Sequence, residues 1–322
     1  MPRLNTRWIS FFAACVAALF TLVAVVGWAS FEEGTKNKDK GNAYGVNLTS
    51  VDEFNQFTNW TDAELALAIV LTIDSFDPSK GSNALGFHLD FIPINNLITE
   101  NGTTAVPVRL VLQSTTTNFA ADSVMATQTV SQILDGDVNR YPFDVFSVDY
   151  DIFGFTSPSN GSFGTPLPMT IFSQGAIQGF KIDTAFQGLA DDGSAVDITI
   201  TVSRSPITKA YSVLIILVMW CLSGGIFIAA MSVFFRERKV EPPLIAISTG
   251  LLFALPNVRN SQPGIPAVAG TTSDMVGFFF NILLVAVSAF SLIVNYIVKN
   301  RRVSTVWARE DSADVYVRSR RR

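Results

Sequence analysis

The chain has 322 residues, of which 48% are hydrophobic and only 16% are charged. In soluble domains about a quarter of all residues are usually charged, so this composition favours a membrane protein. The net charge of −4 is unevenly spread, because residues 31–209 hold 21 acidic and 9 basic side chains. That acidic segment argues against a nucleic-acid partner, since nucleic acids are bound through Lys and Arg that neutralise phosphates.

The first predicted element is a transmembrane helix at residues 8–31, which carries no charge. Its 24 residues exceed the 7–15 or so of a signal-peptide core, so we expect a retained signal anchor, with cleavage as the alternative. Arg3 and Arg7 in residues 1–7 place the N-terminus in the cytoplasm by the positive-inside rule. Residues 32–209 are then expected outside.

This outer segment is expected to form a β-sandwich. Apolar and polar residues alternate over four short runs, at 85–91, 106–112, 146–152 and 196–202. Such alternation is typical of strands with one face on a core and one face in water. Both cysteines, Cys15 and Cys221, fall in predicted membrane helices, so no disulfide is expected in the sandwich.

Three further membrane helices are predicted after the outer domain, at residues 210–235, 242–257 and 275–298. The loop at 236–241 is basic and is expected inside, the loop at 258–274 outside, and the basic tail at 299–322 inside. The short, proline-flanked helix at 242–257 is included because the arginine-rich tail would otherwise lie outside. The expected fold class is therefore an α+β membrane protein with four transmembrane helices, one before and three after a β-sandwich-like domain. Both termini are expected in the cytoplasm, at the plasma membrane or an endomembrane.

Four N-glycosylation sequons lie in the segment that charge counting places outside, at Asn47, Asn59, Asn101 and Asn160. The acceptor pattern is Asn-x-Ser/Thr, which is used on the lumenal side of the membrane. We therefore expect a glycoprotein in a eukaryotic host.

The last predicted helix carries a polar stripe. Asn281, Ser288 and Asn295 are spaced seven residues apart, which puts them on one face. Polar groups in hydrocarbon need partners, so this face must meet protein or a water-filled path. Helix packing is the favoured interpretation, and a pore-lining face is the alternative.

Enzyme chemistry is disfavoured, and no cofactor or metal is expected. His88 is the single histidine, so a His/Cys zinc site is excluded. The run from Asp135 resembles the start of a calcium loop, but Arg140 and Phe146 stand where that motif requires Gly and Glu. A polar turn between strands is the simpler interpretation.

Five consecutive residues are predicted to dock the outer domain onto the membrane helices: Arg140, Tyr141, Pro142, Phe143 and Asp144. Pro142 cannot donate a ladder hydrogen bond, which places the segment at a sheet edge or in a loop. In an extended chain, Tyr141 and Phe143 would point to one side and Pro142 to the other.

The charges of this segment need partners. Arg140 and Asp144 are expected either to pair with each other or to reach the outer loop near Arg259 and Asp274.

Two stretches, residues 134–144 and 254–266, resemble the uncharacterised membrane family known as domain of unknown function 4436. The resemblance implies one helix, an outer domain and three further helices, and it implies no activity. The favoured function is a non-enzymatic binding or scaffold protein that acts through its outer domain, and a channel subunit is the alternative. The expected partners are the lipid bilayer and, outside, a protein or a second copy of the chain.

Overall fold

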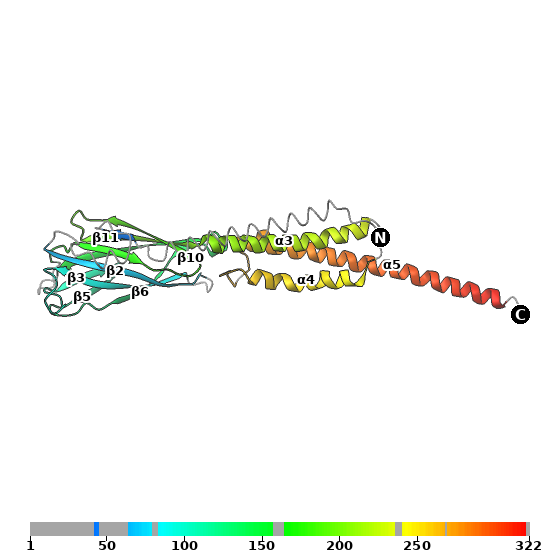
Figure 1. Cartoon of the computed structure of the whole chain (residues 1–322), viewed down its shortest axis with the longest axis horizontal. Coiled ribbons are helices and arrows are strands. Elements are labelled where there is room, and N and C mark those ends of the chain that lie inside the picture. The colour runs from blue at the N-terminus through cyan, green and yellow to red at the C-terminus, as the bar shows by residue number, and fades with distance from the viewer. Residues whose placement is uncertain are drawn as a thin grey trace. The chain divides into compact units, whose positions relative to one another are not determined.

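The computed structural model describes residues 42–44, 64–78, 83–156, 164–235, 240–267 and 269–319, with the backbone alone for 42–44 and 300–319. The chain divides into two compact units, Met1–Ala210 and Tyr211–Arg322. The described residues of the first unit form mainly strands, and those of the second form mainly helices (Figure 1). The mixed α+β class expected from the sequence is therefore confirmed.

One sheet of the first unit has five strands in the order β1-β9-β2-β3-β6. β2 and β9 run parallel, and the other neighbours run antiparallel. The strands are β1 (Asn42–Tyr44), β2 (Leu65–Phe76), β3 (Ala84–Asn95), β6 (Gln128–Ile133) and β9 (Met169–Gln174).

The other sheet has six strands, all paired antiparallel, in the order β10-β11-β8-β4-β5 with β7 beside β8. They are β4 (Val108–Leu112), β5 (Thr115–Phe119), β7 (Asp135–Gly136), β8 (Val145–Thr156), β10 (Phe180–Gly188) and β11 (Ala195–Arg204). The alternating runs of the sequence lie in β3, β4, β8 and β11.

The two sheets share one hydrophobic core, to which both contribute their inward-facing residues. Aromatic pairs join the sheets: Phe87 of β3 meets Tyr150 of β8 with ring centroids 5.3 Å apart, and Phe91 of β3 lies 5.6 Å from Phe119 of β5. Burial raises the pKa of Tyr150 to about 12. The alternation gives each sheet one apolar face, and the two apolar faces pack against each other. Each aromatic ring adds a large apolar area to the core.

In the part that the structure describes, the second unit has three long helices that run side by side (Figure 1). They are α3 (Pro206–Phe235), which begins in the first unit, α4 (Pro242–Asn260), and α5 (Phe280–Ser319), which a π-helical turn at Asp274–Phe279 precedes. α4 runs three residues past its expected end. α5 continues into the expected tail, because no glycine or proline interrupts residues 280–319.

Close packing holds these helices together. Ile215, Met219, Leu255 and Val285 form a buried cluster among α3, α4 and α5. A Cβ atom on Gly277 would lie 3.1 Å from side-chain atoms of two α3 residues, so glycine allows the close approach there.

Among the described residues, two helices are long and apolar enough to cross a membrane. They are Pro206–Phe235, with a mean hydropathy of 2.6, and Asp274–Lys299, with 2.3. Length and composition thus suggest a membrane association. α4 is not one of the two, and the predicted helix at 8–31 lies outside the described residues.

Candidate functional site

The predicted docking segment is a tight turn. Its first part is a 3₁₀ helix at Val138–Arg140, capped by the Asp137 carboxylate, which accepts from the Asn139 N–H at 2.9 Å. The Phe143 N–H then bonds the Arg140 carbonyl at 2.8 Å. Because the chain turns, Tyr141 is fully buried while Phe143 is 57% exposed. The expectation that these two rings share one side is wrong.

The Asp144 carboxylate is fully buried and binds Arg204 at the end of β11. The Arg204 Nε donates to both carboxylate oxygens at 3.1 Å. The expected pairing of Asp144 with Arg140 or with the 258–274 loop is therefore wrong. The cause is sheet register: β8 and β11 are neighbours, and Val145 lies opposite Ser203, so the residues beside them meet.

Aromatic rings surround this pair. The Arg204 guanidinium carbon lies 5.0 Å from the centre of the Tyr141 ring and 4.6 Å from that of Phe180, distances at which a cation is attracted to a ring face. The Arg204 Nη2 is buried with no hydrogen-bond partner among the described residues. Burial raises the pKa of Asp144, against the attraction of Arg204.

A sequence signal for Arg204 existed but was missed. The buried residues of β11 are every second one, from Val196 to Val202, and Arg204 continues this series. A cation in phase with a buried face requires a buried anion. The partner is 60 residues away in the chain, which is why local reasoning did not find it.

Arg140 differs from Asp144. Its side chain is 77% exposed, and its Nε lies 3.9 Å from Asp137, a geometry worth little in water. Within the segment, Tyr141, Pro142 and Asp144 are thus buried in the sandwich, and Arg140 and Phe143 are exposed. Docking of this segment onto the helices stays a prediction.

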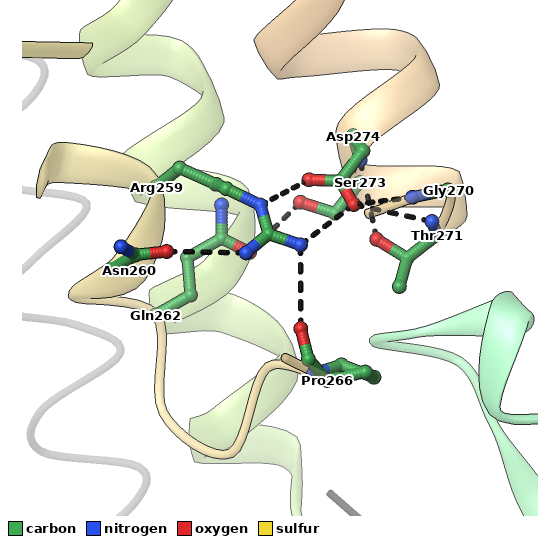
Figure 2. A network of polar contacts seen from close by, with 8 residues as sticks. All are labelled: Arg259, Asn260, Gln262, Pro266, Gly270, Thr271, Ser273 and Asp274. Carbon is green, nitrogen blue, oxygen red and sulfur yellow. Dashed lines mark hydrogen bonds and ion pairs between the residues drawn. The ribbon is translucent and has the colours of Figure 1, made fainter. Parts of the chain in front are cut away.

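A second buried pair lies in the connection between α4 and α5 (Figure 2). Arg259, in the last turn of α4, donates from Nε to Asp274 Oδ1 at 2.6 Å and from Nη2 to Oδ2 at 2.8 Å. Asp274 is fully buried and begins the π-helical turn. This two-point contact fixes both the distance and the orientation of the two helix ends.

Backbone groups complete that network. Asp274 Oδ2 also accepts from the Gly270 N–H at 2.9 Å and the Thr271 N–H at 3.2 Å, and Arg259 Nη2 reaches the Pro266 carbonyl at 3.3 Å. Figure 2 shows these donors converging on one carboxylate. The chemistry is that of a structural clamp, because every charge in it is already matched.

Residues 57–202 match the family model DUF4436, a domain of unknown function. The expected resemblance is thereby confirmed for that part of the chain. Residues 204–299 match another model, DUF8686, also a domain of unknown function, and the 254–266 stretch lies within it. No curated protein matches the chain.

The two matched regions meet at the first buried pair. Asp144 lies inside the DUF4436 region, and Arg204 is the first residue of the DUF8686 region. The Arg259–Asp274 clamp belongs wholly to the DUF8686 region. Each region thus supplies one partner of the first pair, and the second region supplies both partners of the other.

The polar stripe of the DUF8686 region is mostly covered by protein. Asn281 is fully buried, Ser288 is 2% exposed, and Asn295 is half-buried. Asn281 and Ser288 donate to carbonyls of their own helix, from Gly277 and Leu284, rather than across to another helix. The Asn281 Oδ1 is buried and has no partner among the described residues.

Of the four sequons, Asn101 is exposed in a turn of the DUF4436 region. Asn47, Asn59 and Asn160 lie outside the described residues. His88 contacts two carboxylates, with Nδ1 2.8 Å from Asp74 and Nε2 3.5 Å from Asp90. The described residues contain no group of three or more His, Cys, Asp or Glu placed to hold a metal ion.

Like charges meet on the outward face of the six-stranded sheet. Asp197 of β11 lies directly opposite Asp151 of β8, and Asp149 is two residues along. Burial raises the pKa of Asp197, and the charges of Asp151 and then Asp149 raise it further. A basic side chain or surface placed there would relieve this repulsion.

Proposed function

We propose that this is a non-enzymatic, multi-pass membrane protein that binds a protein partner through an extracytoplasmic β-sandwich. Four helices cross the membrane, at residues 8–31, in α3, in α4 and in α5, with both termini in the cytoplasm. The sandwich faces outward and carries N-linked glycans. A subunit of a membrane channel is the competing function.

One observation favours a binding or scaffold role over a pore. Of the three stripe residues of α5, Asn281 and Ser288 are buried against protein and Asn295 is half-buried. A pore-lining face would leave them open to water. The burial of these two side chains instead supports a packed bundle.

The partner surface is assigned to the outward face of the six-stranded sheet. Directly opposed carboxylates such as Asp151 and Asp197 lower the stability of a sheet. A basic partner would convert this cost into binding energy, and opposite charge would also speed the encounter.

Proximity labelling in the native cell tests the binding role, with the labelling enzyme fused to an outer loop. The Asp149→Asn/Asp151→Asn variant should lose the outer-side partners that the unaltered protein labels. Asp122→Asn is the matched control, because Asp122 is exposed and sits at a positive φ of 58° that asparagine tolerates. Equal labelling by all three proteins would refute the acidic face as the partner surface.

The topology has its own test. Tags on both termini should react only after the inner side of the membrane is opened, and Asn→Gln changes at the four sequons should remove a glycan-dependent mass shift stepwise. A C-terminal tag that reacts on intact cells would exclude four crossings.

A further inference from the structure

The helical unit has an open pocket between the end of α3 and α5. Its volume is about 440 Å³. Its apolar wall comes from Phe234 of α3 and from Phe290, Val294 and Val298 of α5. Its polar wall comes from α5 alone and consists of Ser291, Asn295 and Lys299. A hydroxyl, an amide and an ammonium group therefore share one pocket with apolar side chains.

Helix periodicity sorts these side chains into two neighbouring rows. Residues four apart lie about one turn above each other on the same face of a helix. Ser291, Asn295 and Lys299 follow at this spacing and form the polar row. The apolar row runs beside it, with the same spacing from Phe290 to Val298. The polar row ends in a cation at one end of the pocket.

The apolar row continues along α5 away from Lys299. Leu283 and Val287 precede Phe290 at helical spacing and are 60% and 51% exposed, and Phe290 itself is 69% exposed. From Leu283 to Lys299 the helix rises about 24 Å. A long hydrocarbon chain therefore has a continuous apolar surface to follow into the pocket.

The two helices are in close contact beside the pocket. Leu292 of α5 is 1% exposed and packs in one buried cluster with Ala230 and Val233 of α3. Leu292 follows directly after Ser291 in the chain. The wall of the pocket thus belongs to a packed part of the helical unit.

The cationic end of the pocket lies where two apolar spans end. The span of α3 ends at Phe235, and that of α5 ends at Lys299. Basic residues follow both spans in the sequence, at Arg236 and at Arg301. A lysine at the end of a membrane helix reaches the headgroup region. The proposed topology puts this end on the cytoplasmic side, where anionic phospholipids are found.

We propose that this pocket binds an anionic phospholipid of the cytoplasmic leaflet. The lipid phosphate accepts hydrogen bonds from the Lys299 ammonium and the Asn295 amide, and an acyl chain lies along the apolar row from Phe290. The charge of Lys299 favours an anionic over a neutral headgroup, and the apolar row favours a lipid over a free phosphate. The inference rests on the proposed membrane topology and adds a specific lipid site to it.

Native mass spectrometry of the full chain in a neutral detergent tests the proposal. Dioleoyl phosphatidylserine or dioleoyl phosphatidylcholine is added at the same concentration, and the fraction of chains that retain lipid is measured. We expect phosphatidylserine to be retained about fivefold more, the factor that one lysine contributes near an anionic surface.

Charge variants locate the site. Lys299→Gln should lower retention of phosphatidylserine about fivefold, to the level of phosphatidylcholine. Lys209→Gln is the matched control, because it removes the same charge in the first turn of α3, at the opposite end of that helix from Phe234. It should leave retention within about twofold, less than the effect of one lysine at the site.

A filling variant tests the apolar wall. Val294→Trp should lower retention of both phospholipids, because the larger side chain occupies the pocket while Lys299 keeps its charge. Ile228→Trp is the control, since Ile228 is 63% exposed on α3 and does not line the pocket. Glycerophosphoserine, which has the headgroup without acyl chains, should not displace bound phosphatidylserine.

Equal retention of the two lipids by the unaltered chain would overturn the proposal. So would an equal loss in the Lys209 and Lys299 variants, or full retention after Val294→Trp. Displacement by glycerophosphoserine would show a phosphate site and overturn the lipid assignment. These failures leave the proposed function standing if alkaline carbonate still retains the chain in membranes. A chain released by carbonate would contradict both.

Discussion

The two buried Arg–Asp pairs have the same chemistry but differ in what surrounds the carboxylate. Asp274 accepts from two guanidinium nitrogens and from two backbone N–H groups. Asp144 accepts from the Nε of Arg204 at both oxygens, and that guanidinium leaves a buried nitrogen without a partner among the described residues.

The difference shows how sheet and helix environments support a buried charge. At a helix terminus, free backbone N–H groups are available and can be directed at a carboxylate. In a sheet these groups are used by the ladder, so support for Arg204 comes from the rings of Tyr141 and Phe180 instead. The helical pair therefore has more of its hydrogen-bonding groups satisfied. The sheet pair depends more on packing against its aromatic neighbours.

The largest effect is expected at the helical clamp. Asp274→Ala leaves Arg259 buried without its anion and frees two backbone donors, so we expect a loss of about 3–5 kcal/mol in the free energy of unfolding. Thermal unfolding of the detergent-purified chain, followed by tryptophan fluorescence, measures it.

The matched control is the double change Arg259→Leu/Asp274→Leu, which removes both charges. It should be more stable than the single variant, because no uncompensated charge remains. A single variant as stable as the unaltered protein would mean that Arg259 is not buried as described.

A smaller loss, about 3 kcal/mol, is expected for Asp144→Ala, because the cation of Arg204 keeps its two aromatic neighbours, which contribute up to about 2 kcal/mol. Because the variant is less stable, its folding yield and its delivery to the cell surface should also fall. Asp191→Ala, at an exposed position, is the control. Normal stability and trafficking of the Asp144 variant would refute the importance of this pair.

The smallest effect is expected at Asp197, a carboxylate whose neighbours are also acidic. The folded-state pKa of Asp197 is raised above the ordinary 3.8, so its ionisation costs stability as pH rises through the raised value. Asp197→Asn should therefore stabilise the protein by about 0.2–1 kcal/mol at pH 7. The gain should vanish below pH 3.8, where Asp197 is protonated in both states. A gain that persists in acid would assign the effect to packing instead.

The alternating pattern predicted β3, β4, β8 and β11, because each has one face in the core and one in water. It did not predict β9, in which five of six residues are buried and no alternation exists. The long helices followed from uncharged runs. The sequence predicts a loop at 258–274 that contains Arg259 and Asp274, but Arg259 lies in the last turn of α4 and Asp274 begins the π-helical turn. Their pairing with each other is not among the sequence-based predictions.

The candidate site was predicted less well than the fold. The sequence indicates that Asp144 needs a partner, but Arg204 lies 60 residues away, and its pairing depends on which strands are neighbours. An extended chain would put Tyr141 and Phe143 on one side, but the local turn separates them. Alternation of apolar and polar residues predicts strands, but it determines neither which distant strands pair nor how the chain turns between them.

Because β2 pairs in parallel with β9, the ribosome makes β2 well before it makes one of the two strands that flank β2. The Gln174 side chain of β9 donates to Thr72 of β2 across 102 residues of sequence. At about 5–20 residues per second, the ribosome needs roughly 5–20 s to deliver β9 after β2. During that interval β2 has β3 on one side and an unpaired edge on the other. The nascent chain therefore exposes a strand edge that a chaperone could cover until β9 is made.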